Sequence, residues 1–142
     1  MRRLLLLTAV ALVLAAPAGA GTRNPCLLVR SSDASAALGA KTAAGKAQTL
    51  GLYKACVYTS GRKKLTVLLR TIPSKAAFEK SAKQNPGPVF PIPGVGDDAF
   101  SAGAGSALLV WKKGVELTFV FVGASPVVQT QKDLANAAVG RL

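Results

Sequence analysis

The sequence predicts an α+β fold, with one antiparallel sheet of about five strands and about three helices packed mainly on one face. The main observation is that segments with a period of two occur in adjacent pairs, each joined by a short polar turn, as in β-hairpins. A second observation is that segments with helical spacing, several of them led by serine, precede, separate and follow these pairs. Helices laid against an antiparallel sheet are the simplest packing for this order of elements.

The first 20 residues are expected to be a secretory signal peptide. Arg2 and Arg3 precede an apolar run over residues 4–16, and Ala18 and Ala20 then provide a small-residue cleavage site. The run is shorter than the roughly 20 residues of a comfortable membrane span, and an uncleaved anchor is the alternative. Residues 21–142 would then be a single domain, secreted or held in the periplasm or cell envelope, and long enough to bury a core.

The chain is strongly basic, with 18 lysines and arginines against 6 acids and no histidine. Cleavage near Ala20 would remove two arginines and leave a net charge of about +10. This charge predicts anionic partners, which for an exported protein are envelope polymers, lipid head groups or an acidic protein. Nucleic acid fits the charge less well, because few aromatic residues lie among the basic ones and the protein is expected to be exported. No later stretch reaches membrane-spanning length.

The two cysteines, Cys26 and Cys56, predict one disulfide, because an even count in an exported chain is usually oxidised. A metal site is the alternative, but no histidine or third cysteine exists to complete the ligand set. We therefore expect no metal ion and no cofactor.

The first half of the domain is expected to form one short helix and one hairpin. The polar run at residues 31–33 offers N-cap oxygens for a helix near residues 32–39, which ends at Gly39. Residues 41–48 are rich in Gly, Ala and Lys and are expected to form a loop. Two strands with a basic turn between them follow: residues 50–58, the turn at 60–64, and residues 65–72. In the first strand, Leu50, Leu52, Cys56 and Tyr58 are expected to share one face, which Lys54 interrupts.

The second half is expected to follow a similar order. Ser74 is a candidate cap for a helix that reaches about Gln84, where Asn85–Pro88 stops it. In the last strand, Val115, Leu117, Phe119 and Phe121 share one face, while Glu116 and Thr118 lie opposite. Ser125 and Pro126 predict the cap and first turn of a terminal helix. The expected segments are a short strand entered at residues 99–100, strands at 107–111 and 115–122, and a helix to about residue 141.

The heptapeptide Gly94–Phe100 (GVGDDAF) places paired carboxylates after two glycines. A catalytic or metal-binding loop is one interpretation, but adjacent carboxylates in extended chain point to opposite faces, and the alternating ligands of a calcium loop are missing. A turn is the favoured interpretation. In it Gly94 and Gly96 supply the dihedral angles, and Asp97 and Asp98 accept hydrogen bonds from nearby backbone N–H groups.

The residue types also limit the chemistry that we expect. The lack of histidine excludes histidine-based triads, histidine-ligated zinc and imidazole acid–base catalysis. Oxidised cysteines would provide no thiolate nucleophile. An enzyme would need an Asp/Lys/Tyr or Ser/Lys arrangement that sequence spacing does not reveal. We expect no catalytic residue and a protein that is not an enzyme.

Four short motifs point to a known family: Pro25-Cys26-Leu27-Leu28, Ala37-Leu38-Gly39, Cys56-Val57-Tyr58 and Gly94-Val95-Gly96-Asp97-Asp98-Ala99. In this order, over about residues 24–142, the chain resembles domain-of-unknown-function family 3558, whose members are secreted bacterial proteins, many of them actinobacterial lipoproteins. The resemblance implies an α+β sandwich similar to the PsbP-like group and a bridge from Cys26 to Cys56. The chain departs from the family in lacking a lipobox cysteine and in carrying Tyr58 where tryptophan is expected.

The family carries no established activity, so function is predicted from the residues. We expect an exported binding or scaffolding domain whose contacts lie at the two hairpin tips: Arg62, Lys63, Lys64, Lys112 and Lys113. The alternative is that these charges only keep the turns solvated and the sheet edges unpaired. A second functional hypothesis is an apolar ligand or lipid held between sheet and helices by aromatic residues, which would otherwise be core: Tyr53, Tyr58, Trp111, Phe119 and Phe121.

Overall fold

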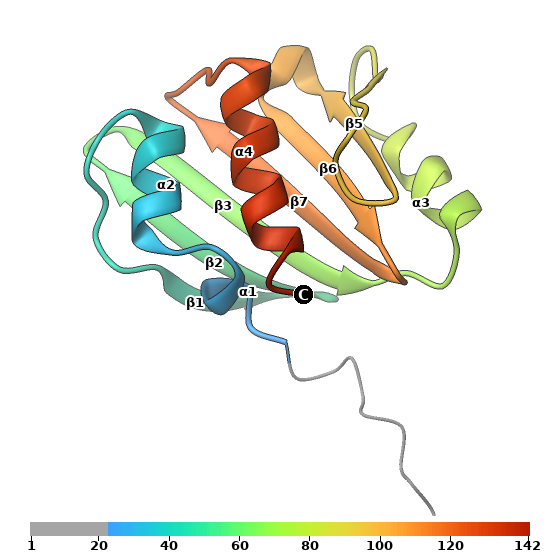
Figure 1. Ribbon diagram of the computed structural model, residues 1–142, viewed down its shortest axis with the longest axis horizontal. Coiled ribbons are helices and arrows are strands. Elements are labelled where there is room, and N and C mark those ends of the chain that lie inside the picture. Colours follow the sequence, from blue (N-terminus) through green and yellow to red (C-terminus); the bar gives the residue numbers. More distant parts are fainter. Residues whose placement is uncertain (1–22) are drawn as a thin grey trace, which may run out of the picture.

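The computed structural model describes residues 23–142, which form an α+β domain with one antiparallel sheet (Figure 1). The predicted fold class is confirmed, but the expected five strands and three helices are only roughly right, because this range contains seven strands and four helices. The predicted signal peptide, residues 1–20, lies outside the described residues. None of the helices between residues 23 and 142 is long and apolar enough to cross a membrane.

The two predicted hairpins lie side by side at the centre of the sheet, whose strand order is β1-β2-β3-β7-β6-β5-β4. Strands β3 and β7 pair from Lys64 opposite Val122 to Thr71 opposite Val115, so the β2–β3 and β6–β7 turns lie at opposite ends of the sheet. The strands are β1 (Lys46–Leu50), β2 (Tyr53–Ser60), β3 (Lys63–Thr71), β4 (Phe90–Pro91), β5 (Asp98–Ala102), β6 (Ala107–Lys112) and β7 (Val115–Val122).

Three of the helices cover one face of the sheet, and the fourth packs on the other face. Figure 1 shows α2 and α4 lying across the same face, with α3 set apart beside β5 and β6. Alternation along β6 separates the two faces: Leu108 and Val110 join the core under α2 and α4, whereas Leu109 packs with Phe78 of α3. The helices are α1 (Pro25–Leu28), α2 (Ser31–Leu38), α3 (Lys75–Ala82) and α4 (Val128–Val139).

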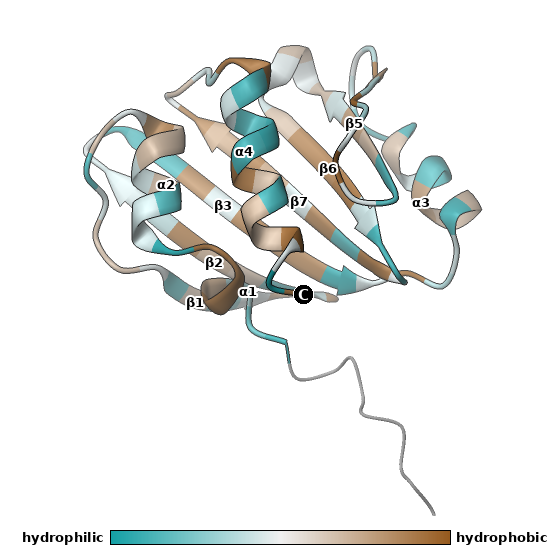
Figure 2. Ribbon diagram, viewed as in Figure 1, coloured by the Kyte–Doolittle hydropathy of each residue, from teal (hydrophilic) through white to brown (hydrophobic). Residues whose placement is uncertain are grey.

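The main core lies between the sheet and the helices α1, α2 and α4. Figure 2 shows hydrophobic stretches of β3, β6 and β7 beneath α2 and α4. The predicted core face of β7 is confirmed, since Val115, Leu117, Phe119 and Phe121 are all buried there. Each such side chain contributes roughly 1.5–3 kcal/mol when it leaves water, so this row is a major source of stability.

The start of the first hairpin differs from the expectation. Residues 41–48 are not all loop, because β1 begins at Lys46 and forms an edge of the sheet. Leu50 and Leu52 do not share a strand face: Leu50 ends β1 and Leu52 lies in the turn to β2. All five residues of β1 are exposed, so the strand lacks the apolar alternation that marks a half-buried strand.

The helix ends agree with the predictions in part. Ser74 caps α3 by accepting a hydrogen bond from the Ala77 N–H, as predicted. In α2 the N-cap is Arg30, and Asp33 accepts a hydrogen bond from its N–H at 2.9 Å. The Ser125–Pro126 start predicted for the last helix is wrong, because α4 begins after Val127 with no side-chain cap. The Pro126 carbonyl instead accepts a hydrogen bond from Gln131, which holds this segment in a non-helical path.

Candidate functional site

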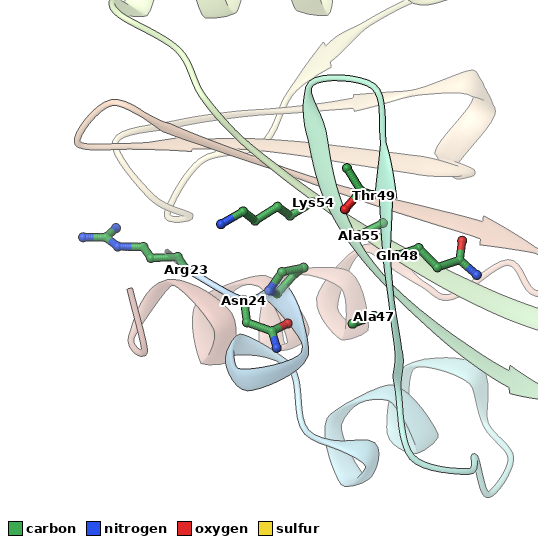
Figure 3. Close-up of a pocket in the computed structure, with 8 residues that line it drawn as sticks. Arg23, Asn24, Ala47, Gln48, Thr49, Lys54 and Ala55 are labelled. Carbon is green, nitrogen blue, oxygen red and sulfur yellow. The ribbon is translucent and has the colours of Figure 1, made fainter. Parts of the chain in front are cut away.

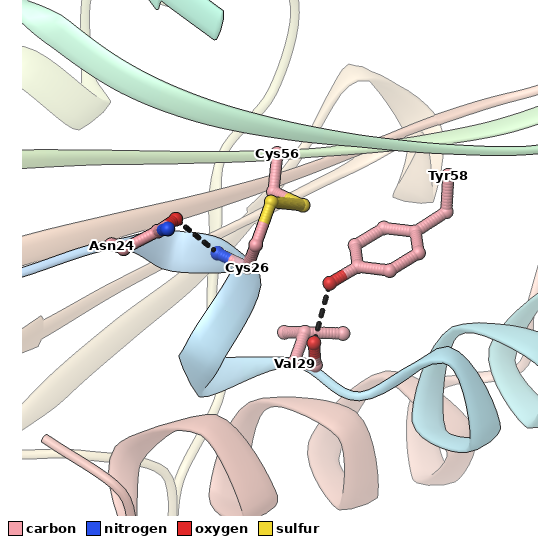
Figure 4. The surroundings of a disulfide bond; sticks show 5 residues. All are labelled: Asn24, Cys26, Val29, Cys56 and Tyr58. Carbon is pink, nitrogen blue, oxygen red and sulfur yellow. Dashed lines mark hydrogen bonds between the residues drawn. A yellow bond between two sulfur atoms is a disulfide. The ribbon is translucent and has the colours of Figure 1, made fainter. Parts of the chain in front are cut away.

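The predicted disulfide is confirmed and joins α1 to β2 (Figure 4). Cys56 is fully buried, and the nearby Tyr58 hydroxyl donates a hydrogen bond to the Val29 carbonyl. Burial raises the pKa of Tyr58, with a contribution from the negative charge of Asp33, so its hydroxyl keeps its proton and stays a donor. Gly45 passes so close that a Cβ there would lie 2.3 Å from the Cys56 sulfur. The bridge is therefore a packed structural element with no exposed thiol.

The GVGDDAF loop forms a turn that leads into β5. Gly94 and Gly96 both have positive φ, and a Cβ on Gly96 would meet the Trp111 carbonyl at 2.7 Å. Asp97 accepts hydrogen bonds from Lys112 Nζ at 2.6 Å and from the Lys113 N–H at 3.0 Å. These bonds hold the pKa of Asp97 below its usual value.

Asp98, the second carboxylate of this loop, has contacts that differ from those of Asp97. One Asp98 oxygen accepts a hydrogen bond from the Ala99 N–H, and the other lies 3.7 Å from Lys75 Nζ. The two aspartates therefore serve different contacts and share no site. No group of three or more potential metal ligands occurs among residues 23–142.

The two basic hairpin tips do not form one surface, because their turns lie at opposite ends of the sheet. Lys63 donates a hydrogen bond to the Leu38 carbonyl at 2.9 Å, and Lys112 pairs with Asp97. These two lysines thus have structural contacts, while Arg62, Lys64 and Lys113 are exposed.

The aromatic residues of the apolar-ligand hypothesis are separated by the sheet. Tyr58, Phe119 and Phe121 belong to the core under the helices. Trp111 packs on the α3 side, and Tyr53 lies on that same face, with its ring 4.9 Å from the Arg70 guanidinium carbon. The five aromatic side chains therefore do not line a common pocket.

A polar cluster that the sequence did not indicate lies on the α3 face. Arg70 and Glu116 are opposite each other on β3 and β7 and form an ion pair of 2.7 Å. The same Arg70 nitrogen donates to Ser81 of α3, and Thr118 donates to the other Glu116 oxygen. Burial and the Glu116 charge together raise the pKa of Tyr53. The sequence signals were Arg70 and Glu116, each a charge among apolar residues of a strand.

A second group of charges lies where the β1–β2 turn, the β6–β7 turn and the end of α4 meet. Two surface pockets, of about 410 and 250 Å³, open here, and Arg23 borders both. Lys54 lines the first pocket, and Lys112 and Lys113 line the second. Figure 3 shows Arg23 and Lys54 extending their side chains to the same side of the β1–β2 hairpin. We refer to Arg23, Lys54, Lys112 and Lys113 as the basic end.

The remainder of each pocket wall is polar or apolar but not acidic. Asn24, Gln48 and Thr49 add amide and hydroxyl groups to the first pocket, and Val139 and Leu142 add an apolar wall to the second. No aspartate or glutamate is among the lining residues of either pocket. A ligand in these pockets would therefore meet positive charge together with hydrogen-bond donors.

Most acids of the chain are paired away from the basic end, and the exception is Asp97, which pairs with Lys112. Five of the six lie within ion-pair distance of a lysine or arginine: Asp33, Glu79, Asp97, Asp98 and Glu116. The sixth, Asp133, accepts a hydrogen bond from Gln129 at 2.7 Å. The fold thus uses its acids internally and leaves most of its cations facing outward.

Comparison of the chain with family models, with curated proteins and with solved structures finds no match. The family resemblance described above therefore stays a prediction.

Proposed function

We propose that the protein is an exported, non-enzymatic module that binds an anionic partner through the basic end. The observation that carries this proposal is the convergence of Arg23, Lys54, Lys112 and Lys113, from three separate parts of the chain, around two adjoining pockets without an acidic wall. Export is supported by the sequence pattern of residues 1–20 and by the disulfide, which is typical of oxidising compartments.

The charge of this site exceeds what the fold itself needs. The C-terminal end of α4, which lies at the second pocket, offers about half a negative charge, and Asp97 offers one more. These negative charges offset only part of the positive charge of Arg23, Lys112 and Lys113. An arginine beside a lysine suits phosphate or carboxylate groups, because the guanidinium can bind two oxygens at once.

The β2–β3 tip is a weaker candidate for the same role. Lys63 donates its side-chain hydrogen bond to the end of α2, and no other charged residue lines the pocket beside it. Arg62 and Lys64 are exposed near this tip without a pocket that brings further cations to them. Exposed lysines and arginines of this kind need no ligand to explain them, because these residue types are mostly exposed in folded proteins.

The test uses two variants that each remove three positive charges. The site variant carries Arg23→Gln, Lys54→Gln and Lys113→Asn, where asparagine suits the positive φ of position 113. The control carries Lys41→Gln, Lys80→Gln and Lys83→Gln, all at exposed positions that line neither pocket. Fluorescence anisotropy with labelled polyphosphate at low salt should show at least about tenfold weaker binding for the site variant only. Equal weakening in the two variants would mean that net charge, and not this site, drives binding.

A further inference from the structure

The β1–β2 turn beside the basic end carries two exposed leucines. Leu50 is 47% exposed and Leu52 is 87% exposed. A Cβ on Gly51, between them, would have no atom within 4 Å, so the turn projects away from the body of the domain. Scattered exposed apolar residues are ordinary, but two that flank the apex of a projecting turn form a small apolar tip.

The apolar tip and the cations lie at the same end of the sheet. Leu50 pairs with Tyr53 and Thr49 pairs with Lys54, so Lys54 is one register position from the turn. Thr49 and Lys54 both line the pocket that Arg23 borders, and Arg23 also borders the pocket of Lys112 and Lys113. The leucines line neither pocket, and Leu50 points to the opposite face of the sheet from Thr49 and Lys54, so Leu50 and Leu52 form the outermost tip of the hairpin that carries Lys54.

We infer that the anionic partner is the surface of a membrane that contains anionic lipid, with Leu50 and Leu52 inserting among the lipid head groups. This inference rests on the proposed function and names its partner. A soluble anionic polymer would complement the charges but would leave the leucines in water. A lipid surface complements both, because it places negative charge directly above an apolar layer.

Neither the cations nor the leucines alone would give stable attachment to a membrane. Each lysine or arginine held near an anionic membrane strengthens binding by about fivefold, so a few cations alone give weak and salt-sensitive attachment. Two partly inserted leucines alone would likewise give only marginal binding, since stable attachment takes two signals. Removal of either element should therefore release most of the protein.

The experiment compares three probes: neutral phosphatidylcholine vesicles, vesicles containing phosphatidylglycerol, and polyphosphate in solution. The tip variant carries Leu50→Ser and Leu52→Ser, both at exposed positions. Its matched control carries Val127→Ser and Val128→Ser, an exposed apolar pair at the start of α4, away from the basic end. Co-sedimentation measures vesicle binding, and anisotropy measures polyphosphate binding.

The expected result is that wild-type protein binds the anionic vesicles and not the neutral ones. The tip variant should bind the anionic vesicles at least about tenfold more weakly, with polyphosphate binding unchanged. The valine control should behave as wild type with every probe. In a Trp111→Phe background, the emission of Leu52→Trp should shift to shorter wavelength only with anionic vesicles.

The results that would contradict the membrane inference differ from those that would contradict the anion-binding function. If the tip variant binds anionic vesicles as well as wild type while polyphosphate binding persists, the membrane inference is wrong and the anion-binding function stands. If the valine control loses as much binding to anionic vesicles as the tip variant, the membrane inference is likewise wrong and the anion-binding function stands. If wild-type protein binds neither vesicles nor polyphosphate, both proposals fail.

Discussion

Arg70 and Glu116 face each other across β3 and β7, with 2.7 Å between the guanidinium and a carboxylate of which only 2% is exposed. The pair ties the centre of the sheet to α3, because Arg70 also donates a hydrogen bond to Ser81. A buried charge is tolerated when it is both paired and hydrogen-bonded, and Glu116 has the Arg70 and Thr118 donors. We therefore assign this cluster to the attachment of α3.

Replacement of Glu116 by alanine should destabilise the fold by about 3 kcal/mol, because it leaves the Arg70 guanidinium, at 21% exposure, without its partner. The double variant Arg70→Met/Glu116→Leu should lose much less, since apolar side chains of similar size replace both charges. Urea unfolding of the single and double variants measures this coupling. Strictly additive losses would show that the two side chains do not stabilise each other.

Gly45 should tolerate no larger residue. An added Cβ would lie 2.3 Å from the Cys56 sulfur and 2.6 Å from the Tyr58 ring carbon Cζ, in a fully packed region. Gly45→Ala should therefore lower the free energy of unfolding by about 1–3 kcal/mol. Ala44→Ser, at the exposed neighbouring position, is the control and should change little. Equal stability of Gly45→Ala and wild type would mean that the chain does not pass this close to the bridge.

Loss of the disulfide should cost about 3–4 kcal/mol, because the bridge closes a loop between cysteines separated by 30 positions. The variant Cys26→Ala/Cys56→Ala should unfold at lower urea concentration than the oxidised protein. Thiol titration of denatured, unreduced protein tests directly whether Cys26 and Cys56 are joined. Two titratable thiols there would contradict the bridge.

The Asp33–Arg141 pair should make stability depend on acidic pH. Burial alone would raise the pKa of Asp33, but hydrogen bonds from Arg141 and the Arg30 N–H, with the charges of both arginines, outweigh it and lower the pKa below its ordinary 3.8. Because the folded state holds the carboxylate ionised, its stabilising contribution is present above pH 3.8 and is lost as pH falls through the lower folded-state pKa.

Urea unfolding as a function of pH tests this linkage. Wild-type protein should lose more stability than Asp33→Asn as pH falls below about 4, while at neutral pH the variant should be the less stable of the two. Asp133→Asn is a suitable control, since this acid accepts a hydrogen bond only from a neutral glutamine. Parallel pH profiles for wild type and Asp33→Asn would exclude the linkage.

The sequence predicts best those parts of the fold in which apolar residues recur at a regular spacing. The β7 strand was predicted with its correct face, because alternate residues from Val115 to Phe121 enter the core. The β1 strand was missed, because an exposed edge strand needs no apolar side. The start of α4 was misplaced, because Ser125 and Pro126 suit a helix start but Val127 is extended and the helix begins only at Val128.

Lys112 and Lys113 were among the predicted contacts, but the sequence could not show that Arg23 and Lys54 lie near them, because these residues are far apart in the sequence. Arg23, Lys54 and Lys113 meet only when β2, β6 and the first described residues reach the same end of the sheet, which depends on strand order. One signal was present: Lys54 interrupts the apolar side of its strand, and it marks where the core ends and the pocket begins. The Arg70–Glu116 pair likewise required the β3–β7 register.

The most direct test of the central claim is the salt dependence of polyphosphate binding by wild type and by the variant Arg23→Gln/Lys54→Gln/Lys113→Asn. If the basic end holds the anion, the slope of log affinity against log salt should fall by roughly two in this variant, because three contacts are lost. The slope of the Lys41→Gln/Lys80→Gln/Lys83→Gln control should match wild type. An unchanged slope in the site variant would contradict the claim.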